Sequence, residues 1–334
     1  MTSVARRSTE IYRRCYCSPS MRVRFFVRRR QVAVLSTPCR TRRMKTIGVI
    51  GLGNMGRGMA LTLQRKGFDV IGTDAAPATR AALAGEGLTV VDTVQQVAAR
   101  ADLLVLSLPT AAIVAQVVAG PGGLLDAPRD GLLVVDTSTS HPDTTRRLAG
   151  QLEAAGMSLI DAPVSGGPRG ALAGTMTMVI GGSEADVARA MMVLQAMSAK
   201  RVHVGPVGAG HVAKIANNLL CAAHLALAGE VTRMAEKAGV PTERLLAGVN
   251  AGSGRSFVTE FNLPTWVCSG SFDSGFTIKL MRKDVRLSQE LIGALDIDLP
   301  LSRRVAELWD QSAATIGDDE DFNRIVELGT RRPA

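Results

Sequence analysis

The stretch KTIGVIGLGNMGRGMA, residues 45–60, gives the clearest indication of the fold. Its first seven positions are mostly apolar, which is typical of a buried strand. That strand runs directly into Gly51-Leu-Gly53-Asn-Met-Gly56, and a segment with the pattern of a helix follows. Asp74 ends the next apolar run, FDVIGTD, about twenty residues further on. A strand, a glycine turn, a helix and an acidic residue in this order predict a dinucleotide-binding α/β unit.

Each glycine of the turn has a physical reason. Gly51 permits the tight turn, Gly53 lets the backbone approach a pyrophosphate, and Gly56 lets the helix pack close to the sheet. The N-terminus of the helix offers backbone N–H groups and a positive dipole end to the phosphates. The predicted cofactor loop therefore consists of Gly51, Leu52, Gly53, Asn54, Met55 and Gly56.

Asp74 is expected to accept hydrogen bonds from the hydroxyls of the adenine ribose. A carboxylate there repels a 2′-phosphate, and Ala75 and Ala76 supply no arginine to hold one. The sequence therefore favours NAD, with NADP possible because Arg80 lies six residues on. The simpler alternative is that Asp74 only caps a helix or a turn.

Apolar runs and helical stretches alternate from Lys45 to about Gly205, which predicts βαβ units and a parallel sheet. Ligands of such sheets bind beyond the carboxyl ends of the strands, so Leu108, Pro109 and Thr139 are expected to flank the cofactor. After Gly205 the patterns are helical, at 209–238, 241–250, 277–292, 300–313 and 322–328. We expect a Rossmann NAD-binding domain over 44–206 and an all-α substrate and oligomerisation domain over 207–334.

The net charge of +9 comes from one end of the chain. Residues 1–43 hold twelve arginines and one acidic residue, so the rest is nearly neutral. We interpret 1–43 as a disordered tail with three possible origins: a stretch upstream of a true start at Met44, a targeting peptide, or an arm for nucleic acid or a membrane surface. The first is favoured, so neither nucleic acid nor a membrane is an expected partner.

The cysteines and histidines argue against a metal. The five cysteines show no CxxC spacing, and the four histidines do not cluster with carboxylates at the spacing of metal ligands. No uncharged apolar run reaches the ~18 residues that a membrane span needs. We expect reduced thiols, no metal, and a cytoplasmic protein.

Four motifs follow one another along the chain: GLGNMGRGMA (51–60), DAPVSGGPRGALAGTMTMVIGG (161–182), GHVAKIANNLL (210–220) and RKDVRL (282–287). They resemble the motifs of the 3-hydroxyacid dehydrogenases, the group of 3-hydroxyisobutyrate dehydrogenase. GSGRSF (252–257) and SGSFDSGF (269–276) are most similar to the branch that includes 2-(hydroxymethyl)glutarate dehydrogenase. The resemblance runs from Met44 to the C-terminus.

The resemblance implies roles for particular residues. Lys214 is implied as the catalytic residue, with Asn218 helping to fix the lysine and the substrate. The substrate carboxylate is implied to lie on Ser165, Gly166 and Gly167, and Lys283 on the nicotinamide side of the cleft.

These roles are chemically sensible. Oxidising an alcohol needs a base for its proton, and burial lowers the pKa of an amine towards the pH at which the enzyme works. The serine hydroxyl and the backbone N–H groups of two glycines suit an anionic carboxylate. In the alternative, Lys214 reaches solvent from a core helix, and Lys283 and Asp284 form a solvated pair. Asn217 and His211 are interpreted as structural.

The function expected is reversible, NAD-dependent oxidation of a small 3-hydroxy acid to a semialdehyde or keto acid, by a homodimer or homotetramer. Two alternatives remain open, an NADPH-dependent semialdehyde reductase of the same family and a non-catalytic NAD-binding protein. Nucleic-acid binding through the tail is a third, and it requires salt-dependent binding that disappears without residues 1–43.

Overall fold

The computed structural model describes residues 45–330, and the predictions for residues 1–43 lie outside that range. One mixed sheet has the strand order β3-β2-β1-β4-β5-β6-β8-β7, with β9 paired to β8. The strands β3 to β6 of this order are parallel, as predicted, whereas β8 runs antiparallel to β6 and β7. The strands are β1 (Thr46–Ile50), β2 (Asp69–Thr73), β3 (Thr89–Val90), β4 (Leu103–Leu106), β5 (Leu133–Asp136), β6 (Ser158–Asp161), β7 (Val164–Ser165), β8 (Met176–Gly181) and β9 (Ser198–Gly205).

Helices bury both faces of this sheet. In β4, Leu103 and Val105 face one hydrophobic cluster while Leu104 and Leu106 face the other, because successive side chains of a strand alternate. The helices that contribute buried side chains to the first cluster are α1 (Asn54–Arg65), α2 (Pro77–Gly85), α6 (Gly167–Ala173) and α7 (Glu184–Met197). Those of the second are α3 (Val94–Ala98), α4 (Ala111–Ala119), η1 (Leu124–Asp126) and α5 (Pro142–Ala154).

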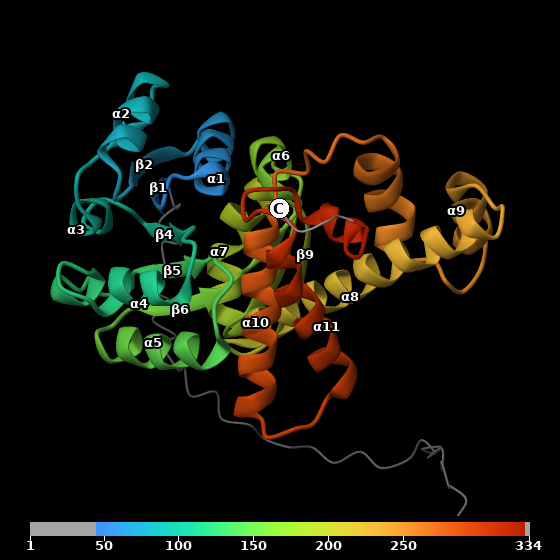
Figure 1. The fold of residues 1–334 in the computed structure, drawn as a ribbon. Coiled ribbons are helices and arrows are strands. Elements are labelled where there is room, and N and C mark those ends of the chain that lie inside the picture. The colour runs from blue at the N-terminus through green and yellow to red at the C-terminus, as the bar shows by residue number, and fades with distance from the viewer. Residues whose placement is uncertain (1–44, 331–334) are drawn as a thin grey trace, which may run out of the picture. The chain divides into compact units, whose positions relative to one another are not determined.

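From Ala209 onwards the described chain is helical, and α8 runs through this part as one long helix (Figure 1). Trp309 lies at the centre of its core, fully buried, and its indole N–H donates to the carbonyl of Ala222 on α8. α10 and α11 pack against α8 and against each other. The elements are α8 (Ala209–Lys237), α9 (Thr242–Ala251), η2 (Val258–Cys268), α10 (Ile278–Ala294), α11 (Pro300–Gln311), η3 (Ser312–Ala314) and η4 (Phe322–Glu327).

Three helical segments differ from the sequence-based expectation. η2 is a π-helix that was not predicted, and Pro264 inside it removes the regular hydrogen bond on which a helical pattern depends. α6 is a short helix for which the sequence pattern makes no prediction, and it begins directly after Gly166. The segment predicted over 322–328 is a 3₁₀-helix, closed by shorter-range hydrogen bonds.

α8 is long and apolar enough to cross a membrane by length and composition alone. It packs against β8, α10, α11 and η4, and it carries buried polar side chains such as Lys214 and Asn218. A helix in the interior of a globular protein meets the same criteria, so we describe α8 as a packing helix.

Candidate functional site

The glycine loop after β1 is shaped to receive a pyrophosphate. A Cβ on Gly51 would collide with the carbonyl of Ser107, and one on Gly56 would collide with the carbonyl of Gly51. At Gly53, by contrast, the described residues leave open space around the place of a Cβ. Within residues 45–330, no side chain caps the N-terminus of α1, which begins after Gly53. The loop thus turns bare backbone towards an open space, and the residues present fit a dinucleotide.

Asp74 lies beside this loop, at the end of β2. Its carboxylate accepts backbone hydrogen bonds from Leu52 (2.8 Å) and Ala76 (2.9 Å). Arg80 donates to the carbonyl of Asp74 (2.7 Å) and pairs with Asp92 (3.3 Å). The guanidinium of Arg80 is thus held by these partners, while the carboxylate keeps free lone pairs for hydroxyl donors.

The loops after β4 and β5 are joined to each other and to α10. The backbone N–H of Leu108 donates to Oγ of Ser138 (3.0 Å), next to the half-buried Thr139. Nζ of Lys283 on α10 donates to the carbonyl of Pro109 (3.3 Å). The structure therefore brings Lys283 to the loop of Leu108 and Pro109, and Thr139 follows the serine to which this loop is bonded.

Lys214, on the second turn of α8, is buried, with 9% of its surface exposed. Nζ lies 3.1 Å from Oγ of Ser165, to which it donates. Burial lowers the pKa of this amine from its ordinary value, because the charged form loses its hydration, and the nearby Lys283 lowers it further. The carboxylate of Asp284 acts in the opposite direction. The result is an amine poised to exchange a proton, in contact with the predicted substrate loop.

Gly166 and Gly167, which follow Ser165, adopt left-handed backbone angles with φ of 119° and 61°. Other residues rarely adopt such angles. The two positions therefore turn the chain sharply between β7 and α6, and they carry no side chains of their own.

A buried carboxylate that sequence reasoning did not assign completes the site. Asp284 is 2% exposed, and its Oδ2 accepts a hydrogen bond from Nδ2 of Asn218 (2.6 Å). Its Oδ1 lies 3.0 Å from Nζ of Lys283. The alternative interpretation, a solvated Lys283–Asp284 pair, does not hold for Asp284, because this carboxylate is buried. The sequence signal that could have identified Asp284 is its position next to Lys283, in the RKDVRL motif.

Asn217 is exposed and donates from Nδ2 to Oδ1 of Asn218 (3.0 Å). It thereby fixes the orientation of the Asn218 amide, whose own Nδ2 is directed at Asp284.

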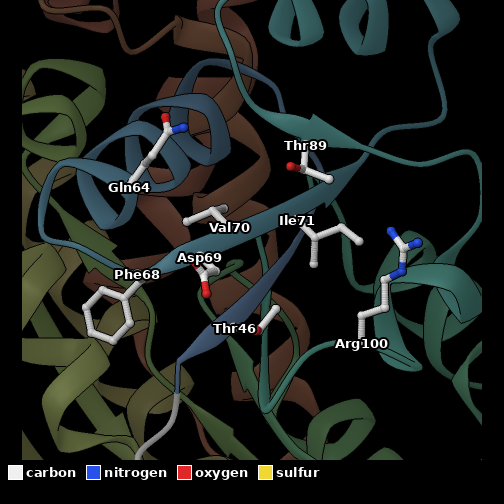
Figure 2. Close-up of a pocket in the computed structure, with 8 residues that line it drawn as sticks. All are labelled: Thr46, Gln64, Phe68, Asp69, Val70, Ile71, Thr89 and Arg100. Carbon is white, nitrogen blue, oxygen red and sulfur yellow. The ribbon is translucent and has the colours of Figure 1, made fainter.

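A separate hollow of about 470 Å³ lies at the opposite ends of the strands. Figure 2 shows its lining, in which Thr46 and Asp69 are the first residues of β1 and β2, together with Gln64 and Arg100. The glycine loop and Asp74 follow the other ends of the same two strands. This hollow therefore lies away from the site around Lys214.

Metal-binding residues do not gather in the part of the chain that the structure describes: no group of three His, Cys, Asp or Glu could hold an ion there. Cys221 and Cys268 are free thiols. Burial raises the pKa of Cys221 to about 11, so this thiol stays protonated at neutral pH.

Comparison with known proteins identifies the family. Residues 46–205 match the family model of the NAD-binding domain of 6-phosphogluconate dehydrogenase. Residues 208–328 match that of the NAD-binding domain of NADP-dependent 3-hydroxyisobutyrate dehydrogenase. Together the two models cover nearly all of the described chain.

Individual relatives agree with this match. The chain is 36% identical to 2-(hydroxymethyl)glutarate dehydrogenase of Eubacterium barkeri, over 84% of this chain and 94% of that protein. It is 31% identical to the mitochondrial 3-hydroxyisobutyrate dehydrogenase of Mus musculus, over 90% and 92%. The structure of a Mycobacterium tuberculosis 3-hydroxyisobutyrate dehydrogenase with L-serine superposes with a TM-score of 0.80 at 33% identity, covering 85% of this chain and 98% of that one. The chain therefore belongs to the 3-hydroxyacid dehydrogenase family, with an NAD-binding α/β domain followed by a helical domain.

Proposed function

We propose that this NAD-dependent dehydrogenase oxidises a small 3-hydroxy carboxylic acid reversibly, with Lys214 as its general acid–base. One observation carries the proposal: a buried amine in hydrogen-bond contact with a serine that opens a glycine loop. The proposal also agrees with the L-serine in the Mycobacterium tuberculosis structure, since L-serine is itself a 3-hydroxy acid.

The chemistry divides between the cofactor and the chain. When bound, NAD accepts the hydride from the carbon that bears the hydroxyl. The neutral amine of Lys214 takes the hydroxyl proton as the C=O bond forms, and the ammonium returns it in the reverse direction. Its lowered pKa makes both protonation states accessible nearer to neutral pH than for an exposed lysine. The ammonium also stabilises negative charge on the substrate oxygen in the transition state.

We assign the substrate carboxylate to Ser165, Gly166 and Gly167. The hydroxyl of Ser165 and the N–H groups of the two glycines are donors, and an anion needs donors. Because Ser165 also contacts Lys214, a carboxylate held there would bring the neighbouring hydroxyl towards the amine.

Lys283 and Asp284 on α10, together with Asn218 on α8, are assigned to supporting Lys214. Asn218, held by Asp284, is assigned to fixing Lys214 and the substrate. Lys283 reaches the loop of Pro109 and is assigned to the nicotinamide side of the cofactor. Asp284 provides the fixed negative charge that limits how far burial lowers the pKa of Lys214.

We assign NAD to the glycine loop and to Leu108, Pro109 and Thr139 at the strand ends. Asp74 supports a preference for NAD over NADP, because its carboxylate would repel a 2′-phosphate. Arg80, held by Asp74 and Asp92, would have to leave both partners to bind that phosphate.

Three further assignments are proposals. A domain boundary near residue 206 is supported by the two family models, which meet between residues 205 and 208. A homodimer or homotetramer is supported by Leu220, Leu227 and Met234, which share one face of α8 and are 58%, 58% and 65% exposed. A cytoplasmic location is supported by the free thiols of Cys221 and Cys268.

A substrate panel tests the proposed function. The full chain would be assayed with 3-hydroxyisobutyrate, 2-(hydroxymethyl)glutarate, L-serine and matched 2-hydroxy acids, each with NAD and with NADP. The corresponding semialdehydes would be assayed in the reverse direction, each with NADH and with NADPH. We expect NADH formation from at least one 3-hydroxy acid and none from the 2-hydroxy isomers. Turnover only of semialdehydes with NADPH would favour the reductase, and cofactor binding without any turnover would favour a non-catalytic protein.

A further inference from the structure

A buried polar cluster lies one helical turn before Lys214. His211 is completely buried, and its two ring nitrogens have different partners: Nδ1 lies 2.8 Å from Oγ1 of Thr145, and Nε2 lies 3.0 Å from the carbonyl oxygen of Ser138. Asp136 and Asp161 stand further away, with carboxylate oxygens 3.9 Å from Nε2 and 3.8 Å from Nδ1.

The carbonyl partner of Nε2 shows that this ring nitrogen carries a proton. A carbonyl oxygen can only accept, so Nε2 must carry a hydrogen and donate it to Ser138. Nδ1 faces the hydroxyl of Thr145, which also lies 3.3 Å from the carbonyl oxygen of His141. Both ring nitrogens thus have a polar partner, which a fully buried polar side chain requires.

The bond to Ser138 reaches the cofactor side of the molecule. Ser138 belongs to the loop after β5, and its Oγ accepts from the backbone N–H of Leu108 in the loop after β4 (3.0 Å). One residue thus links the two loops assigned to the cofactor, and His211 holds the main chain of that residue.

The backbone of His211 is held as firmly as its ring. α8 begins after Gly208 without a capping side chain of its own, and Asp161 at the end of β6 supplies the cap. Its Oδ1 accepts from the N–H of Gly208 (2.7 Å) and its Oδ2 from the N–H of His211 (2.8 Å). A carboxylate at this place also complements the helix dipole.

Gly210 allows the first turn of α8 to approach the sheet closely. A Cβ on Gly210 would lie 2.7 Å from the carbonyl oxygen of Val179 and 2.8 Å from that of Asp161. The first turn of α8 therefore rests directly on the sheet, and Lys214 follows three residues after His211.

We propose that His211 is a positioning residue that couples the loop of Ser138 to the helix of Lys214, so that cofactor binding and proton transfer share one fixed frame. The inference rests on the proposed function for its kinetic part only. That part depends on the position of the Lys214 amine relative to the cofactor loop. A misplacement of about 1 Å can lower a rate by about a hundredfold.

Two substitutions separate the two ring contacts in the full chain. The amide nitrogen of His211→Gln reaches about as far as Nε2 and can still donate to Ser138, whereas that of His211→Asn reaches only as far as Nδ1. We expect His211→Asn to raise the dissociation constant of NAD and to lower kcat, each by about tenfold. A tenfold change is the size expected when one hydrogen-bond contact is lost. His211→Gln should stay within about threefold of the wild type in both. Thr145→Val should do the same, because it removes the hydroxyl that faces Nδ1 and bonds the carbonyl of His141 but leaves the bond from Nε2 to Ser138.

The measurements are the dissociation constant of NAD by calorimetry, kcat with the best substrate, and the midpoint of thermal unfolding. A lower midpoint with an unchanged dissociation constant in folded His211→Asn would overturn the coupling. If that variant does not fold, the ¹⁵N resonance of His211 Nε2 in the wild type decides instead. It should shift when NAD saturates the protein, and an unmoved resonance would refute the coupling. Because NAD binding is measured without substrate, this test remains valid even if no hydroxy acid is turned over.

Discussion

The amine of Lys214 and the hydroxyl of Ser165 lie 3.1 Å apart although 49 positions separate them in the chain. Lys214 belongs to α8 in the helical half, and Ser165 belongs to the short strand β7 at the margin of the sheet. The contact thus joins the element assigned to proton transfer with the element assigned to the substrate carboxylate. The buried carboxylate of Asp284 and the amine of Lys283 act on the pKa of Lys214 in opposite directions.

The pH dependence of oxidation should report on Lys214. The base must be neutral, and its pKa is lowered from 10.5 mainly by burial, so kcat/KM for alcohol oxidation should rise with pH and level off below pH 10.5. Asp284→Asn removes a charge that raises this pKa, so the rise should move to lower pH. Lys283→Ala removes a charge that lowers it, so the rise should move to higher pH.

The opposite signs make the two variants controls for each other. The measurement is kcat/KM across pH at saturating NAD, because this quantity follows the groups of the enzyme before the hydroxy acid binds. Shifts of both variants in the same direction would show that another group titrates.

Ser165→Ala should weaken substrate binding selectively. The variant removes one donor to the substrate carboxylate, and a hydrogen bond to a charged group contributes about 1.5–3 kcal/mol. We expect KM for the hydroxy acid to rise about tenfold or more while the dissociation constant of NAD stays unchanged. An equal loss of affinity for NAD would place Ser165 at the cofactor instead.

The sequence was sufficient for the parallel strands from β3 to β6 and for the glycine turn after β1, since both depend on local patterns, whereas the antiparallel direction of β8 was not predicted. The apolar runs, the glycine turn and Asp74 identify strands and a helix start wherever the rest of the chain lies. Lys214, Ser165 and Asn218 were assigned through resemblance, because residues this far apart share no local pattern. Asp284 was missed for a physical reason: a Lys–Asp pair on a helix is usually solvated, and only the packing of α10 against α8 buries the carboxylate.

Gly53→Ala and Gly56→Ala should separate cofactor binding from folding. A Cβ at position 53 enters open space, so the free energy of unfolding should change by at most about 1 kcal/mol. The affinity for NAD should nevertheless fall by about tenfold or more, because a tenfold change corresponds to the loss of about 1.4 kcal/mol of binding free energy.

Gly56→Ala forces a clash with the carbonyl of Gly51, which should destabilise the fold by about 1–3 kcal/mol. Denaturant unfolding and calorimetric titration with NAD would be run on both variants. Unchanged NAD affinity in Gly53→Ala would contradict the assignment of this loop to the pyrophosphate.

Asp74→Asn should relax the preference for NAD. The amide can still accept one of the two backbone hydrogen bonds that the carboxylate receives, and it no longer repels a phosphate. The ratio of kcat/KM with NAD to that with NADP should fall by about tenfold. Asp92→Asn, which changes the exposed partner of Arg80, is the matched control. An unchanged ratio in Asp74→Asn would mean that another residue selects the cofactor.

Transfer of the substrate proton by the Lys214 amine is tested by the turnover of Lys214→Ala. Lys279→Ala is the matched control, since this lysine is exposed and paired with Asp318. We expect Lys214→Ala to lose about 10²–10⁴ in kcat, as for a missing general acid–base, with its affinity for NAD retained and Lys279→Ala unchanged. A folded Lys214→Ala that binds NAD and oxidises the hydroxy acid at the wild-type rate would contradict the account.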